Sequence, residues 1–228
     1  MKTNINWRAG VPMAALIALF GVFFTLDFPS GKSVSAQEKA EIKQGEMLKN
    51  VAELNKEGAL KDIVQGKEGA PNTVIEYSSL TCPHCAHFHE KILPGLKSKY
   101  IKTGKLRYIV REFPLDNLAV AGFMLARCKE DRFYDIIEDL YAHQDDWAFV
   151  KNPIEKLKAR MKKFGYTDET FLSCLRDQSL LDRIVKVRDK ASKSFGVDST
   201  PTLFVNGRLL KGANALSQIE ELMNKKAK

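Results

Sequence analysis

The chain has 228 residues, of which 36 are lysine or arginine and 28 are aspartate or glutamate, so its formal charge is +8. Hydrophobic residues make up 44% and charged residues 28%, which is typical of a globular protein and excludes a disordered chain. The basic residues are interleaved with acidic ones and form no aromatic-studded patch. The charge therefore indicates a solvated basic surface and excludes a nucleic-acid-binding protein.

The first 36 residues have the pattern of a secretory signal peptide. Lys2 and Arg8 precede an apolar run from Val11 to Leu26, and small residues up to Ala36 supply a cleavage site. An uncleaved membrane anchor is the alternative, because the run lies near the short limit of a membrane-spanning helix. Both interpretations predict export, so the four cysteines are expected to meet an oxidising compartment.

The next elements predict a helix and three strands. Residues 37–58 are expected to be helical, because apolar side chains between Gln37 and Asn55 recur at approximately helical spacing. A short edge strand is predicted at Asp62–Val64 and a buried central strand at Thr73–Ser78. A further strand is predicted between Lys105 and Phe113.

A helix is expected between the last two of these strands. Pro83 suits the first helical position, which makes Cys82 the residue that caps a helix running towards Tyr100. Pro94 and Gly95 should kink or interrupt this helix.

Residues 117–194 are predicted to be helical throughout, and a hairpin follows. In the hairpin, Thr202–Val205 and Arg208–Leu210 flank Asn206-Gly207, a strong signal for a two-residue turn. A last helix begins near Leu216. The pattern indicates an α/β unit interrupted by helices. The expected helices of the interruption are Leu118–Cys128, Phe133–His143, Ile154–Phe164 and Glu169–Lys193.

The motif Cys82-Pro83-His84-Cys85 carries the predicted chemistry. A cysteine at a helix N-terminus faces unpaired backbone N–H groups, which stabilise its thiolate. His84 in its cationic form would add positive charge nearby. Cys82 is therefore expected to be acidic and exposed, and Cys85, one turn inside, to be buried and to resolve mixed disulfides. Stabilising the Cys82 thiolate stabilises the reduced form, which favours an oxidant.

The histidines near this motif do not indicate a metal or haem site. His87 and His89 are two apart on a helix and cannot both face one zinc ion together with the cysteines. A c-type haem site needs histidine directly after the second cysteine, where Ala86 stands. We interpret His87, His89 and His143 as ordinary surface or packing residues, and we expect no metal and no cofactor.

Glu76 stands six residues before Cys82 in an otherwise apolar strand. A buried carboxylate at this position could relay a proton to or from Cys85. A glutamate at a strand edge in water is the alternative, and the pattern alone does not decide between them.

Two segments together carry a resemblance to a known family. They are Thr73-Val-Ile-Glu-Tyr-Ser-Ser-Leu-Thr-Cys-Pro-His-Cys85 and Ser199-Thr-Pro-Thr-Leu-Phe-Val-Asn-Gly207, and they flank the helical region. Residues 60–226 resemble the DsbA-type thiol:disulfide oxidoreductases of bacterial envelopes. The resemblance implies an α/β thioredoxin fold with a helical insertion domain. Residues 59–116 and 195–228 would then form the thioredoxin-like domain and residues 117–194 the insertion.

The resemblance also implies roles for single residues. Cys82 would be the nucleophile, Cys85 its buried disulfide partner and Glu76 the buried acid of the family. Pro201 matches a cis-proline beside the active-site disulfide. Thr200 would present backbone groups to an extended substrate.

Cys128 and Cys174 stand alone in the sequence, on two helices of the predicted insertion. Pairing Cys82 with Cys85 leaves these two for each other. A structural disulfide that joins two helices is favoured, and free thiols or a regulatory pair are the alternatives.

These observations predict an enzyme that introduces disulfides into reduced exported polypeptides in the periplasm. The resemblance implies a membrane partner, a quinone-linked reoxidant of the DsbB type, and a monomer is expected. Thr200 is also similar to the residue that disulfide isomerases carry before the cis-proline, so an isomerase or reductase is the alternative. A non-catalytic module of the envelope that binds peptides or a metal is a third interpretation.

Overall fold

The computed structural model describes residues 42–212 and 215–225. The predicted signal peptide, residues 1–36, lies outside the described residues, as does the start of the predicted N-terminal helix. Within the described ranges, every helix is too short or too polar to span a lipid bilayer.

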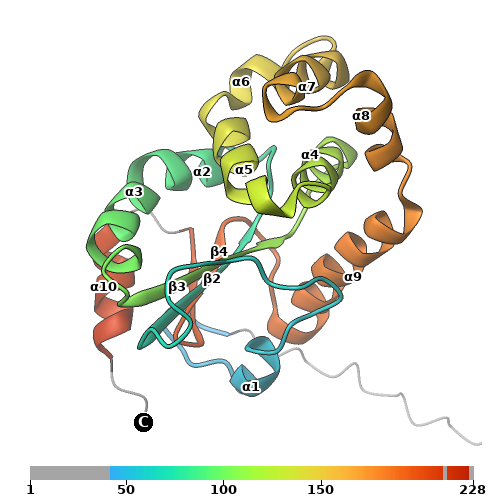
Figure 1. The fold of residues 1–228 in the computed structure, drawn as a ribbon. Coiled ribbons are helices and arrows are strands. Elements are labelled where there is room, and N and C mark those ends of the chain that lie inside the picture. The colour runs from blue at the N-terminus through green and yellow to red at the C-terminus, as the bar shows by residue number, and fades with distance from the viewer. Residues whose placement is uncertain (1–41, 213–214, 226–228) are drawn as a thin grey trace, which may run out of the picture. The chain divides into compact units, whose positions relative to one another are not determined.

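A five-stranded mixed sheet forms the centre of the fold (Figure 1). The strand order is β1-β3-β2-β4-β5, in which β2 and β3 are parallel and the other neighbours are antiparallel. The central strand β2 is buried over its last five residues, which include the apolar Val74, Ile75 and Tyr77 as well as Glu76 and Ser78. The strands are β1 Val64–Gln65, β2 Asn72–Ser78, β3 Leu106–Glu112, β4 Thr202–Val205 and β5 Arg208–Lys211.

Alternating residues of β2 point to opposite faces of the sheet and meet different helices. Glu76 points to the face where it contacts His89, in the helical segment that follows β2. Tyr77 points to the other face, where its ring packs near Phe195 at the end of α9. On the first face, α10 packs against α3 and β4. The segment consists of α2 Pro83–His87, η1 Phe88–Ile92, α3 Leu93–Leu96 and η2 Lys97–Ile101, and α10 is Leu216–Asn224.

This helical segment is interrupted as predicted, and the interruption extends to both sides of α3, which contains Pro94. The turns η1 and η2 are π-helical, so each has one extra residue in its hydrogen-bonded ring. A π-helical turn changes the direction of the side chains that follow it. Phe88 and His89, the first two residues of η1, are buried.

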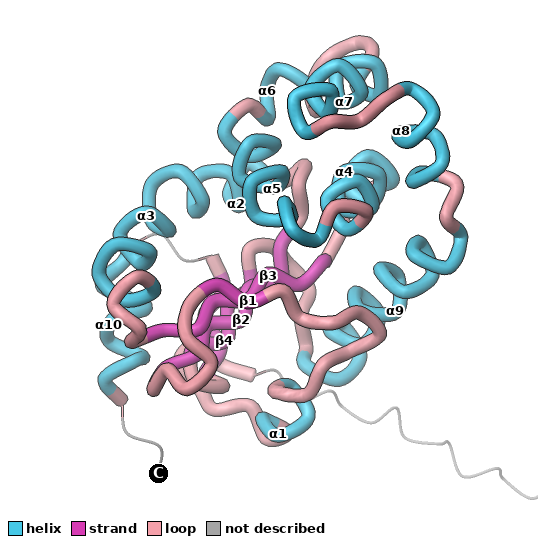
Figure 2. Tube along the Cα trace, in the orientation of Figure 1, coloured by secondary structure: helices cyan, strands magenta, loops and turns pink. Residues whose placement is uncertain are grey.

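Helices fill the sequence between β3 and β4, and Figure 2 shows α4 to α8 grouped at one end of the strands. The predicted helix Glu169–Lys193 is wrong as a single element, because it is divided between α8 and α9. Asp177 interrupts it, since its side chain accepts a hydrogen bond from Leu180 N and caps α9. The helices are α4 Asn117–Arg127, η3 Glu130–Arg132, α5 Phe133–Ala142, α6 Gln144–Trp147, α7 Pro153–Met161, η4 Lys162–Phe164, α8 Asp168–Leu175 and α9 Gln178–Phe195.

The predicted N-terminal helix over residues 37–58 is also wrong for most of its described part. Only α1, Val51–Leu54, is helical. Residues before it pair with the edge of β5: Leu48 N donates to Gly207 O, and Leu209 N donates to Glu46 O. The backbone groups of this segment thus form hydrogen bonds with the open edge of the sheet. In a helix they would have formed hydrogen bonds within the segment itself.

The β4–β5 hairpin forms where the Asn206-Gly207 pair predicts it. Asn206 and Gly207 both have positive φ angles, 50° and 80°, as a two-residue turn of this type requires. Val51 of α1 packs over the turn so closely that a Cβ atom on Gly207 would lie 2.7 Å from its Cγ2 atom. Glycine is therefore required here both by conformation and by space.

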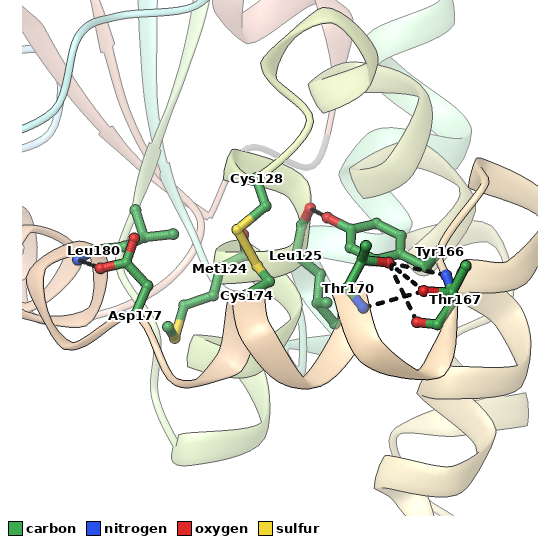
Figure 3. The surroundings of a disulfide bond; sticks show 9 residues. All are labelled: Met124, Leu125, Cys128, Tyr166, Thr167, Thr170, Cys174, Asp177 and Leu180. Atoms are coloured by element: carbon green, nitrogen blue, oxygen red, sulfur yellow. Dashed lines mark hydrogen bonds between the residues drawn. A yellow bond between two sulfur atoms is a disulfide. The ribbon is translucent and has the colours of Figure 1, made fainter.

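A disulfide joins Cys128, at the end of α4, to Cys174 in α8 (Figure 3). The two Cα atoms are 6.2 Å apart. Tyr166, between α7 and α8, also donates a hydrogen bond to Leu125 O of α4 at 2.5 Å. The disulfide thus closes the loop that contains α5 to α7 and fixes α8 against α4.

Replacing both cysteines, Cys128→Ala with Cys174→Ala, is expected to lower the free energy of unfolding. The sequence separation is 46 residues, and the chain-entropy model gives about 4 kcal/mol for a loop of this length. Urea unfolding of the oxidised protein and the double variant measures the difference. If the disulfide is purely structural, Cys82 should be as reactive in the double variant as in the wild type. An unfolding midpoint equal to that of the wild type would contradict the stabilising role of the disulfide.

Candidate active site

The cysteine motif lies where β2 ends and α2 begins. Cys82 is the N-cap residue, with an extended backbone, and Pro83 occupies the first turn of the helix. The carbonyl oxygen of Cys82 accepts hydrogen bonds from the backbone N–H groups of Cys85 and Ala86, both at 3.1 Å. The local sequence thus sets the position of Cys82, because proline at the first helical position needs no N–H partner.

Hydrogen bonds stabilise a negative charge on the Cys82 sulfur and lower the pKa of this thiol to about 5. The largest cause is the hydrogen bond from the Cys85 side chain, and burial opposes it. The Thr200 side chain and the backbone N–H groups of Cys85 and His84 lower the pKa further. His84 thus contributes through its backbone, and the electrostatic contribution of its exposed imidazole stays a prediction.

The Cys85 thiol has the opposite character. It is fully buried, and burial raises its pKa well above the ordinary value. Its hydrogen bond to Cys82 and the negative charge of Glu76 raise the pKa further. The two thiols are free in this structure, which is therefore the reduced form. At neutral pH the geometry favours a Cys82 thiolate beside a protonated Cys85.

The expectation of an exposed Cys82 is wrong, since its side chain is only 5% exposed. The loop before β4 covers it, and the Cys82 thiol lies within hydrogen-bonding distance of the Thr200 carbonyl oxygen, at 3.3 Å. The peptide bond between Thr200 and Pro201 is cis. The structure thus brings Thr200 and Pro201 to the sulfur of Cys82, across 118 residues of sequence.

Glu76 is fully buried, not at a strand edge in water. Its Oε2 atom accepts a hydrogen bond from the Tyr108 hydroxyl and lies 3.2 Å from His89 Nε2. Its Oε1 atom is buried and has no hydrogen-bond partner among the described residues. The negative charge of Glu76 contributes to the raised pKa of Cys85, so the buried acid acts electrostatically on the buried thiol.

Sequence reasoning missed two residues of this region. His89 is not a surface residue: it is buried, and its Nε2 atom lies against the acid. Its position four residues after Cys85 could have signalled this burial, because such residues share one helix face. Gln144 is buried at the start of α6, and its Nε2 atom donates to Leu80 O at 2.7 Å and to Cys82 O at 3.2 Å. No local pattern marks Gln144, which lies 62 residues from Cys82.

The other histidines stay away from the acid. His87 and His143 are exposed and line an open cleft of about 400 Å³ that borders Pro83. In the part of the chain that the structure describes, no three histidine, cysteine or acidic side chains are grouped so as to hold a metal ion.

Comparison with known proteins identifies the fold and the family. The profile of the thioredoxin family matches residues 59–225, and the chain therefore belongs to this family. The crystal structure of α-DsbA1 from Wolbachia pipientis superposes with a TM-score of 0.66 at 29% sequence identity, over 71% of this chain and 90% of that one. Within the family, the resemblance to DsbA-type proteins is thus confirmed.

Two further relatives agree with this assignment. BdbD from Bacillus subtilis has the same fold, with a TM-score of 0.63 at 23% identity over 70% of this chain and 89% of BdbD. A Rickettsia typhi protein named for protein-disulfide oxidoreductase activity is 36% identical over 151 residues, which are 64% of this chain. The match covers 55% of the Rickettsia protein, so the chain spans about half the length of this relative.

The ionisation of Cys82 is expected to make the stability of the reduced protein depend on pH. Because folding lowers the pKa of Cys82 to about 5 from an ordinary value of 9.0, its contribution is fully present above about pH 9. The contribution is lost as the pH falls through about 5. Urea unfolding of the reduced protein and of Cys82→Ser, across this range, isolates the effect. A constant difference between the two proteins would contradict the lowered pKa.

Replacement of Cys85 is expected to raise the pKa of Cys82. Cys85→Ala removes the hydrogen bond that lowers this pKa most, so the midpoint of thiolate absorbance should rise by about one unit or more. Cys85→Ser keeps a hydroxyl donor and serves as the matched control, with a midpoint nearer to that of the wild type. Equal midpoints in the alanine and serine variants would show that the side-chain donor does not matter.

Proposed function

We propose that the protein is a thiol:disulfide oxidoreductase that introduces disulfides into exported polypeptides by dithiol–disulfide exchange. The opposed properties of Cys82 and Cys85 support this proposal most directly. The pKa of Cys82 is lowered to about 5, and the pKa of Cys85 is raised. A disulfide between two such sulfurs has one good leaving group and one poor one.

The direction of net transfer follows from the thiolate. Each interaction that stabilises the Cys82 thiolate stabilises the reduced protein relative to the oxidised one. The Cys82–Cys85 disulfide is thereby a stronger oxidant and passes its oxidation to a client. Two kinds of group supply most of this stabilisation: the Cys85 thiol and the backbone N–H groups of Cys85 and His84.

The proposed reaction balances in two exchanges. A client thiolate attacks Cys82 in the oxidised protein, which forms a client–Cys82 disulfide and releases Cys85 as a thiolate. Because the pKa of Cys85 is raised, this thiolate takes up a proton, and we propose Glu76, the buried acid whose charge acts on Cys85, as its source. A second client thiol then attacks the client sulfur, and Cys82 leaves as a thiolate. The client loses two electrons, which Cys82 and Cys85 hold, so the exchange needs no cofactor.

Clients are proposed to bind along the loop that contains Thr200 and Pro201. The Thr200 carbonyl oxygen lies 3.3 Å from the Cys82 sulfur, where it can also meet the backbone of an extended peptide. On the other side of the motif, Pro83 borders the open cleft, which gives a bulky polypeptide room.

The place of action is proposed to be the bacterial periplasm, with the protein exported by the sequence at residues 1–36. The Cys128–Cys174 disulfide supports an oxidising compartment.

Continued turnover requires a reoxidant, and we propose a DsbB-type, quinone-linked membrane protein as this partner. The chain is proposed to act as a monomer on reduced exported polypeptides. Residues 59–116 and 195–228 would form its thioredoxin-like domain and residues 117–194 its helical insertion.

A disulfide isomerase or reductase is the second candidate, because Thr200 precedes the cis-proline. An isomerase predicts efficient refolding of a scrambled substrate by the reduced protein, whereas a disulfide donor predicts rapid oxidation of a reduced one. A non-catalytic envelope module predicts that Cys82 reacts no faster than a free thiol, which disagrees with its lowered pKa.

The oxidised protein is expected to transfer one disulfide per molecule to a reduced peptide with two thiols. Cys85→Ala, charged with an activated disulfide at Cys82, should trap a peptide that has a single thiol as a stable peptide–Cys82 disulfide, because neither Cys85 nor a second client thiol is present to resolve it. Cys82→Ala should show only the rate of uncatalysed exchange. Mass spectrometry of quenched mixtures measures both species. Full dithiol-oxidising activity in Cys82→Ala would disprove the proposed function.

A further inference from the structure

The buried acid Glu76 has a neighbour that the proposed reaction does not use. His89 lies in the π-helical turn η1, and its side chain is 2% exposed. Its Nε2 atom is 3.2 Å from Glu76 Oε2, and its Nδ1 atom has no hydrogen-bond partner among the described residues. A buried imidazole that directs one ring nitrogen at a buried carboxylate favours the charged form of that carboxylate, provided the nitrogen carries the proton.

The two oxygens of Glu76 have different surroundings. Oε2 is held from two sides, by the Tyr108 hydroxyl and by His89 Nε2. Oε1 is buried and unpartnered in the described structure, which leaves it as the oxygen that can accept a further proton. Cys85 is the buried thiol on which the charge of Glu76 acts.

Packing fixes the imidazole ring. Its plane lies against the Tyr141 ring, with the two centroids 4.1 Å apart and the planes inclined at 31°. The Tyr141 hydroxyl in turn pairs with Ser78 at 2.6 Å, and Ser78 contacts the Cys85 thiol. His89 and Ser78 are therefore linked through one aromatic ring, and the ring orientation that directs Nε2 at Glu76 is held by α5.

Few other charges reach His89. The helical segments with the most extensive contacts to η1 are α2, α3 and α5. Segment α3 carries no charged residue, and the next residues of η1, Glu90 and Lys91, pair with each other. The acidic residues of α5 are each paired with a cation: Asp135 with Arg132, Glu138 with Lys97, and Asp139 with Arg160. The titratable groups in contact with His89 are Glu76, Tyr108 and Tyr141, and α2 also carries Cys85 and the exposed His84 and His87.

We propose that His89 is a positioning residue that donates its Nε2–H to Glu76 Oε2 and so keeps the free Oε1 atom ready to take the proton of Cys85. This inference rests on the proposed function. It adds to that function the residue His89, which keeps Glu76 able to accept a proton from Cys85. In the oxidising half of the cycle, Cys82 thiolate attacks a disulfide and forms a mixed disulfide. The Cys85 S–H bond then breaks, the proton passes to Glu76, and the Cys85 sulfur displaces the bound thiol as the Cys82–Cys85 bond forms. The displaced thiolate carries away the electron pair.

Ring closure after reaction with oxidised glutathione tests this role. His89→Leu removes the N–H donor and keeps an apolar side chain, so the Cys82–glutathione adduct should accumulate and close about tenfold more slowly or worse. The pH at which closure reaches half its maximal rate should also move upward. His89→Gln keeps an amide N–H donor and is the matched variant, in which most of the rate should return. Mass spectrometry of quenched samples between pH 5 and 9 gives the rates.

A second comparison separates positioning from a general loss of packing. In a Glu76→Gln background, His89→Leu should slow closure no further, because the carboxylate on which it acts is gone. The thiolate titration of Cys82 in each variant shows whether the site is still folded. Closure at the wild-type rate in His89→Leu, an equal defect in the glutamine variant, or additive defects in the double variant would each overturn the inference.

The same experiment keeps the two proposals apart. If the wild-type protein forms the glutathione adduct and closes its ring, the redox function stands whatever His89 does. If the wild-type protein does not close its ring, the proposed function itself fails. The comparison of the His89 variants therefore begins only after the wild-type protein has been shown to form the glutathione adduct and close its ring.

Discussion

The hydrogen bond between two thiols three residues apart is the interaction on which the rest of this site depends. Cys85 donates to Cys82, and this contact is the largest single cause of the lowered pKa of Cys82. The same contact helps to hold the proton on Cys85. This interaction thus lowers the pKa of Cys82 and adds to the effect of burial, which is the main cause of the raised pKa of Cys85. It exists because a helix begins at Cys82 and places Cys85 one turn inside, at a fully buried position.

The remainder of the structure maintains this difference between the two sulfurs. From the sheet, β2 supplies the buried acid Glu76, whose charge acts on Cys85, and β3 brings Tyr108 to the same carboxylate. From the far part of the chain, the cis-peptide loop brings Thr200 to Cys82. From the helical region, Gln144 holds the backbone on either side of Thr81 through Leu80 O and Cys82 O. Helices that are inserted between β3 and β4 therefore take part in positioning the motif, as well as enlarging the core.

The local parts of this architecture could be predicted from the sequence. The β2 and β3 strands, the start of α2 at Pro83 and the Asn206-Gly207 hairpin all follow from patterns within a few residues. The predictions were wrong where contacts with residues far away in the sequence determine the conformation. The segment before α1 pairs with β5, which no helical spacing reveals. Likewise the packing of His89 against Tyr141 joins two separate helices, and the contact of Gln144 with Cys82 spans 62 residues.

The reduction potential of the Cys82–Cys85 couple tests the central claim most directly, because it measures the free energy that the stabilised thiolate gives to the reduced form. Equilibration of the protein with defined mixtures of reduced and oxidised glutathione yields this value. We predict a reduction potential of about −120 mV, which is the value of the strong oxidant DsbA. This potential is well above the value of protein disulfide isomerase, about −180 mV. A potential of about −230 mV or lower would contradict a disulfide donor and would favour a reductase.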